Sequence, residues 1–133
     1  MFEYPKILLH DCILSDIEIA NSVLSLKFDD GIFIFDEEKQ TYLKRTKCKI
    51  ELCINGLNHN DAYMFVKIEK FHKQRKSEIK FEDLSKEIKE QGFRIYTDFY
   101  SRGLQAILLK GSLNKKEVEI TVTDIDSIKV LSV

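Results

Sequence analysis

Three histidines are the side chains best suited to acid–base chemistry at neutral pH, because the imidazole ring exchanges protons in that range. They are His10, His59 and His72. His10 is followed directly by Asp11, and a carboxylate can orient a histidine that acts as a general base. Adjacent residues of an extended strand point to opposite faces, however. We therefore expect Asp11 to fix a turn and His10 to lie at the rim of a sheet.

Metal ligation is the next chemistry to consider. His59 and Asp61 lie two residues apart in an Asn-rich segment, but two ligands do not make a metal site. The cysteines, Cys12, Cys48 and Cys53, lack the C-x-x-C spacing of zinc or redox sites. We expect turn chemistry at residues 57–61, reduced cysteines in the core, and neither a metal nor a cofactor.

Motifs for nucleotide-driven chemistry are absent from the sequence. It contains no G-x-G-x-x-G, P-loop, G-x-S-x-G or H-E-x-x-H pattern. Catalytic groups can nevertheless assemble from distant residues. A small hydrolase or nuclease that uses His10, His59 or His72 therefore remains an alternative.

Two basic clusters are the features closest to a nucleic-acid signal. One contains Lys44, Arg45, Lys47 and Lys49, and the other contains Lys70, His72, Lys73, Arg75 and Lys76. If the two segments met in space, they would form a phosphate-binding patch. Acidic residues interrupt both, and the net charge of -1 gives no general attraction to nucleic acid. We expect no nucleic-acid partner.

A set of aromatic and basic residues is the best candidate for a binding surface. Its members are Tyr63, Phe65, Arg94, Tyr96 and Tyr100, with Lys73 and Arg75 from the second basic cluster. Aromatic and arginine side chains dominate the hot spots of protein interfaces. The alternative is that these aromatics form the core of a second sheet.

Composition predicts one soluble domain over residues 1–133. The chain is 44% hydrophobic and 32% charged, which is ordinary for a folded protein. No stretch approaches the ~20 apolar residues of a membrane span. The first residues lack the apolar core of a signal peptide. We therefore expect a cytoplasmic protein without a membrane partner.

Alternation of apolar and polar residues with a period of two predicts β-strands along most of the chain. The predicted strands are 13–20, 24–28, 32–35, 47–54, 62–68, 93–100, 104–109, 117–122 and 128–133, after an edge segment at 2–9. The unbroken apolar run at 32–35 predicts a strand covered on both faces. The Asp29-Asp30-Gly31 segment predicts a turn, residues 36–45 a loop or short helix, and residues 71–78 a basic loop.

Helical spacing of apolar residues occurs in one segment, residues 81–91, which Gly92 would end. The sequence therefore predicts a mainly β (α+β) fold. We expect a single antiparallel sandwich or barrel of about eight or nine strands, with one helix docked on it.

The chain resembles, over much of its length, a loose group of small bacterial β-rich proteins. The residues that carry the resemblance are Leu9-His10-Asp11-Cys12, the strand at 16–19, Leu24-Ser25-Leu26 and Asp30-Gly31. Members of the group open with an L-H-D sequence and an early hairpin, and carry a helix followed by strands further on. Some similar domains are proposed as immunity proteins of polymorphic toxin systems. The resemblance implies partner binding and carries no catalytic residues.

These observations favour a non-catalytic binding module, a protein-partner binder of the immunity or accessory kind. A small-molecule-binding β-barrel is an alternative, with the apolar runs 32–35 and 104–109 lining its cavity. Self-association is a further possibility, because the last predicted strand can pair edge to edge with another chain.

Overall fold

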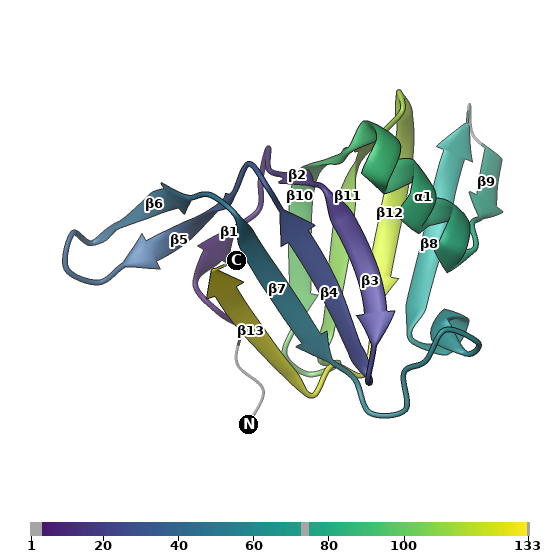
Figure 1. The fold of residues 1–133 in the computed structure, drawn as a ribbon, viewed down its shortest axis with the longest axis horizontal. Coiled ribbons are helices and arrows are strands. Elements are labelled where there is room, and N and C mark those ends of the chain that lie inside the picture. The colour runs from purple at the N-terminus through teal and green to yellow at the C-terminus, as the bar shows by residue number, and fades with distance from the viewer. Residues whose placement is uncertain (1–3, 73–74, 133) are drawn as a thin grey trace.

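Three antiparallel sheets and one α-helix are built from the described residues, 4–72 and 75–132, of the computed structural model (Figure 1). The strands are β1 Ile7–Leu8, β2 Ile13–Leu14, β3 Asp16–Ala20, β4 Val23–Phe28, β5 Ile32–Asp36, β6 Thr41–Arg45, β7 Cys48–Cys53, β8 Val66–His72, β9 Arg75–Glu78, β10 Phe93–Ser101, β11 Ala106–Leu113, β12 Lys116–Val122 and β13 Ser127–Ser132. The helix α1 is Phe81–Gln91, and a 3-10 turn, η1, is Ala62–Met64.

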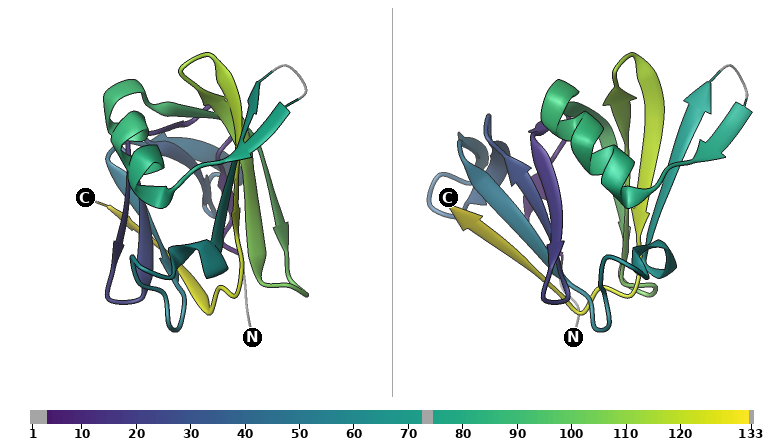
Figure 2. Two further views of the ribbon diagram at one scale, coloured as in Figure 1. Left: turned by 90° about the vertical axis from the view of Figure 1, so that its right-hand side faces the viewer. Right: turned by 45° about the vertical axis from the view of Figure 1, so that its right-hand side comes forward.

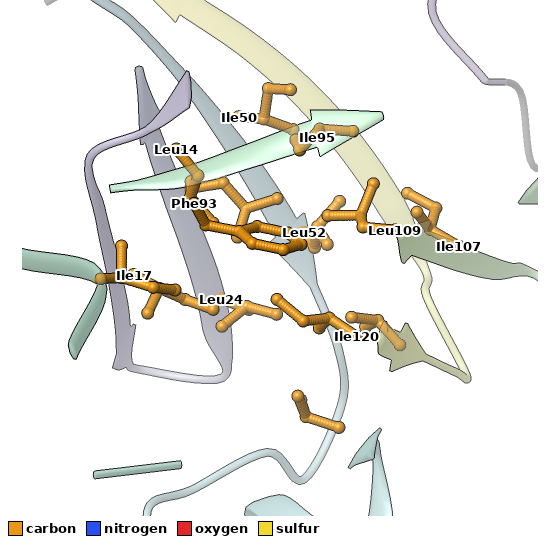
Figure 3. Packing of buried hydrophobic residues seen from close by; sticks show 14 of the residues in the cluster. Leu14, Ile17, Leu24, Ile50, Leu52, Phe93, Ile95, Ile107, Leu109 and Ile120 are labelled. Atoms are coloured by element: carbon orange, nitrogen blue, oxygen red, sulfur yellow. The ribbon is translucent and has the colours of Figure 1, made fainter. Parts of the chain in front are cut away.

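Two of the sheets face each other across the hydrophobic core (Figure 2). The large sheet has the strand order β2-β10-β11-β12-β8-β9, and the small sheet has the order β13-β7-β4-β3. Side chains from both layers meet in the core, with Leu24 and Leu52 from the small sheet and Phe93 from the large sheet (Figure 3). Burial of these apolar side chains is the main force that holds the layers together.

The alternation predicted from sequence explains why each strand has one core face. Leu24, Leu26 and Phe28 of β4 are buried, while Ser25 and Lys27 between them are only half-buried on the other face. Period-two patterning of this kind sets which face of a strand is inward. The predicted β-rich architecture is therefore confirmed.

Helix α1 covers one end of the core, as the sequence predicts. Leu84 and Ile88, one turn apart, are fully buried. The helix packs on β3, where Ser85 Oγ donates a hydrogen bond to the Ile17 carbonyl oxygen at 3.1 Å. Gly92, with φ of 75°, ends the helix, and its N–H donates to the Ile88 carbonyl oxygen at 2.8 Å.

The predicted turn at Asp29-Asp30-Gly31 is present, with the Gly31 N–H donating to the Phe28 carbonyl oxygen at 3.1 Å, but a long bent hairpin replaces the loop that the sequence predicts at residues 36–45. β4 continues into β5, and β6 continues into β7, with a kink at Gly31 and Lys47, both of which have positive φ. The β5–β6 half projects as a third sheet with the order β1-β5-β6 (Figure 1). Residues that favour turns serve here to bend a strand. Only Ile32 of residues 32–35 is buried, so the prediction that this strand is covered on both faces was wrong.

Other strand predictions change in detail. The predicted strand 13–20 divides at Ser15, because β2 joins the large sheet and β3 the small one. The predicted strand 62–68 begins as η1, and residues 71–72 and 75–78 of the predicted loop belong to the paired strands β8 and β9. The predicted strand 104–109 is β11, which begins and ends later and lies centrally. Because predicted strands divide in this way, the structure has more strands than the eight or nine predicted from sequence. The sheets are open, so the prediction of a closed barrel was wrong, and the sandwich alternative holds.

Gly31 provides a test of the kink. A Cβ at this position would overlap the backbone carbonyl of Arg45, and φ is +95°. We expect Gly31→Ala to lower the free energy of unfolding by about 3 kcal/mol, because strain and overlap add. Gly103→Ala is the matched control, since a Cβ there has no neighbour within 4 Å. Urea denaturation measures both, and equal small losses would contradict the role given to Gly31.

Candidate functional site

A β-bulge in β10 decides which side chains this strand presents. Ile95 pairs with Gly111 of β11, but Thr97 pairs with Lys110, so Tyr96 is an extra residue. The bulge reverses the alternation beyond it. A Cβ on Gly111 would overlap the carbonyl of Arg94, so glycine is required opposite the bulge.

Regular alternation along the predicted strand 93–100 would place Arg94, Tyr96 and Tyr100 on one face, and because of the bulge this expectation is wrong. Tyr100 pairs with Ile107, which is buried in the core, so Tyr100 lies on the inner face. Phe99 moves to the outer face and is 56% exposed. Gly111 was the signal that could have located the bulge, because glycine inside an apolar strand marks a bulge or a close approach.

The chain segment before β1 packs on the inner face of β10 beyond the core. The Tyr4 ring stacks on the Tyr100 ring, with centroids 3.8 Å apart and an angle of 7° between the planes. The Tyr4 hydroxyl donates to Asp98 Oδ2 at 3.1 Å. Burial, followed by the negative charge of Asp98, raises the pKa of the Tyr4 hydroxyl well above its usual range.

A groove of about 620 Å³ runs between this N-terminal segment and β10. Residues 4–8 line one side, and Asp98, Tyr100 and Arg102 line the other, with Tyr42 of β6 also contributing. Lys6, also in the lining, lies 3.4 Å from Glu37 Oε1. The groove thus combines aromatic surface with two cations.

Beyond Tyr96, one edge of β10 is open in the described part of the chain. β2 pairs only with Phe93 and Arg94, and Ile95 exchanges backbone hydrogen bonds with Asp11 and Cys12. Past that point no described strand pairs with β10 on this side. We define the β10 edge site as residues 96–101 of this strand, whose edge is open beyond Tyr96, together with the groove.

His10 borders this site and contacts Asp11, contrary to the prediction that the two side chains diverge. His10 Nε2 lies 3.2 Å from Asp11 Oδ2, and Nδ1 contacts the Tyr96 carbonyl oxygen. The prediction failed because both residues form a turn, with Asp11 at φ of 62°, and not an extended strand. The turn at Asp11 and the exposed position of His10 are confirmed. Both ring nitrogens face oxygen atoms, an arrangement that caps the strand edge.

The environment of Cys12, near His10, does not favour a catalytic thiol. Cys12 is buried, and its sulfur contacts the carbonyl oxygens of Leu8 and His10. Burial raises the pKa of the Cys12 thiol, and also that of Cys48. A raised pKa is the opposite of what activates a thiolate nucleophile. Cys53 is half-buried, and all three cysteines are free.

The Asn-rich loop is a turn, as predicted. Asn58 Oδ1 accepts the backbone N–H groups of Asn60 and Asp61, each at 2.9 Å. The His59 ring lies 6.4 Å from the Phe81 ring. No group of three or more potential metal ligands occurs within residues 4–72 and 75–132.

The other predicted binding residues are dispersed. Tyr63, 76% exposed, lies on η1 beside β8, while Phe65 is half-buried against the core. Arg94 lines a separate depression with Asp11 and Lys44. Of the predicted set, only Tyr96 and Tyr100 belong to the β10 edge site.

The described residues of the two basic clusters do not form one patch, because β6 and β9 lie at opposite ends of the molecule (Figure 1). Lys70 pairs with Glu87 at 3.3 Å, and Lys76 pairs with Glu69 at 2.5 Å. Arg75 is exposed on β9. Lys73 and the side chain of His72 lie outside the described part of the protein.

Comparison with protein-family models, with curated proteins and with solved structures finds no match to this chain. Among the described residues, no helix is long and apolar enough to cross a membrane. The fold and site define a β-rich protein with two facing antiparallel sheets, a projecting third sheet and an open strand edge beside an aromatic groove. The resemblance to toxin-immunity domains stays a prediction.

The Tyr4 hydroxyl predicts a specific pH dependence. Its pKa is raised in the folded state, so the unfolded chain ionises first, at a pH of about 10. The stability that neutral Tyr4 contributes is therefore present below pH 10 and lost as the pH rises further. Between pH 9 and 11, we expect the wild type to lose about 1 kcal/mol more free energy of unfolding than Tyr4→Phe. Urea denaturation measures this difference, and equal losses would contradict it.

Proposed function

We propose that this protein is a non-catalytic binding module that holds an extended segment of a protein partner along β10. The observation that carries the proposal is the open edge beyond Tyr96, with aromatic side chains on both faces of the strand. The resemblance at residues 9–12 supports a role of the immunity or accessory kind, and this segment borders the edge.

An unpaired strand edge is a template for another strand. When a peptide adds to such an edge, backbone hydrogen bonds supply affinity, and contacts of alternate side chains supply specificity. An added strand here would place alternate side chains on the two faces of β10. One set would reach Tyr96 and Phe99, and the other would reach the groove beside Tyr100.

The groove favours acidic side chains among those that face it. Arg102 supplies a cation to its lining, whereas Lys6 already pairs with Glu37 and the carboxylate of Asp98 already accepts a hydrogen bond from Tyr4. Tyr42 and Tyr100 add flat apolar surface with hydroxyl groups at the ends. We expect a partner segment with an aromatic or acidic residue at the groove-facing positions.

The alternatives have less support. A ligand-binding barrel requires an enclosed interior, whereas these sheets are open and their facing surfaces are filled by the core cluster. A histidine-dependent hydrolase requires a free ring nitrogen near a nucleophile, whereas both nitrogens of His10 face protein oxygens.

Selection of peptides provides the test. Random 12-residue peptides displayed on phage are selected on the wild-type protein, and their Kd values are measured by calorimetry. We expect Phe99→Glu and Tyr100→Ala each to weaken binding at least tenfold, about 1.4 kcal/mol. Both side chains are substantially exposed, so the fold should be retained.

Tyr63→Ala is the matched control, because Tyr63 is an exposed aromatic outside the site. Its binding should stay within twofold of the wild type. Hydrogen–deuterium exchange should locate new amide protection in residues 96–101 when a peptide is bound. Amide protection in other residues, or peptides that bind both site variants as tightly as they bind the wild type, would contradict the proposal.

A further inference from the structure

The free edge of β3 in the small sheet is blocked by specific contacts. Ile17 donates its backbone N–H to Asp16 Oδ1 at 2.8 Å and accepts a hydrogen bond from Ser85 of α1 at its carbonyl. Lys89 of α1 also lies 3.8 Å from Asp16 Oδ1. The backbone N–H and carbonyl groups of Ile17, with which a further strand would have to pair, are thus already hydrogen-bonded to side chains of β3 and α1.

Other edges carry charge or are very short. β9 has four residues, Arg75–Glu78, all exposed and three of them charged. β1 has two residues, and β6 ends with Lys44 and Arg45, both exposed. Short strands and charged side chains both oppose pairing with another chain.

β13 at the other edge of the small sheet lacks these protections. It pairs with β7 on one side, and no described residue hydrogen-bonds to its other side. Its six residues include one charge, Lys129. Ile128 and Val130 on the inner face are only partly buried, and Leu131 on the outer face is 39% exposed. The core is therefore incompletely covered along this strand.

We propose that β13 pairs antiparallel with β13 of a second copy of this chain, so that the small sheets of two molecules become one continuous sheet. The twofold axis would pass beside Val130, which would lie opposite Val130 of the second copy. This arrangement is independent of the β10 edge, which belongs to the large sheet.

The register is determined by which face of the sheet each side chain lies on and by the position of the charged Lys129. Side chains must keep to their own face, so the register shifts only in steps that preserve the alternation. With the axis at Val130, Lys129 lies opposite Leu131 of the second copy, and Ile128 lies opposite Ser132. With the axis at Lys129, two lysines would lie directly opposite, which is destabilising. An axis at Leu131 would leave fewer pairs.

Self-pairing is favoured because β13 is complementary to itself in this register. Apolar Val130 meets its own copy, and the cation meets an apolar side chain while retaining Glu51 of β7 as its neighbour across the sheet. Pairing of one strand buries a small area, so we expect a reversible dimer that depends on protein concentration.

Sedimentation equilibrium between 5 and 500 µM tests the inference. We expect the wild type to dimerise and Val130→Lys to weaken dimerisation at least tenfold, because an inward-pointing charge on an edge strand opposes pairing. Glu18→Lys, on the blocked β3 edge, and Phe99→Glu, on β10, should dimerise like the wild type. A monomeric wild type, or a dimer that Phe99→Glu dissociates and Val130→Lys does not, would overturn it.

Cross-linking keeps the test valid if Val130→Lys does not fold. Under mild oxidation, Val130→Cys should form a disulfide-linked dimer, because the proposed axis places this residue beside its own copy. Glu18→Cys, on the blocked β3 edge, should not, and the unmodified chain controls for the three natural cysteines. Absence of the Val130→Cys dimer, or equal cross-linking of Glu18→Cys, would contradict the proposed pairing.

Discussion

Hydrogen-bond satisfaction at the edges of open sheets is the constraint on which this structure depends. A closed barrel has no edges, but each sheet here has an edge strand at either end. Unpaired N–H and C=O groups must find side chains, water or another chain. The contacts of Ser85 and Asp16 with Ile17, and of His10 with Tyr96, answer this requirement. Polar residues such as His10 and Asp16 therefore hydrogen-bond the backbone groups of edge strands.

Irregularities in the strands then determine what the edges present. The kink at Gly31 turns β5 and β6 away from the two-layer core and creates the projecting sheet that carries Tyr42. The bulge at Tyr96 turns Tyr100 inward, where the Tyr4 ring can stack on it. Without both irregularities, Tyr4, Tyr42 and Tyr100 would not line one groove. The site is thus a product of departures from regular sheet geometry.

Local patterns were sufficient to predict most elements from sequence. Alternation identified β4, β7 and β12, and helical spacing identified α1 with its end at Gly92, because these signals depend on neighbouring residues. Assignment of strands to sheets depends on contacts between distant segments, so the crossing at Ser15 and the bent hairpin were missed. The candidate site was missed for the same reason, because Tyr4 and Tyr100 are far apart in the sequence and come into contact only in the folded protein.

The groups left available at the β10 edge argue for recognition of a polypeptide. Asp98 is engaged by Tyr4, and both nitrogens of His10 face oxygens. Cys12 is buried with a raised pKa. Reactive groups near the edge are therefore already committed to internal contacts, whereas the backbone edge beyond Tyr96 and the exposed rings of Tyr96 and Phe99 are not. Such groups match a second strand more closely than a compact metabolite, because a strand offers complementary backbone groups at the same spacing and side chains to both faces.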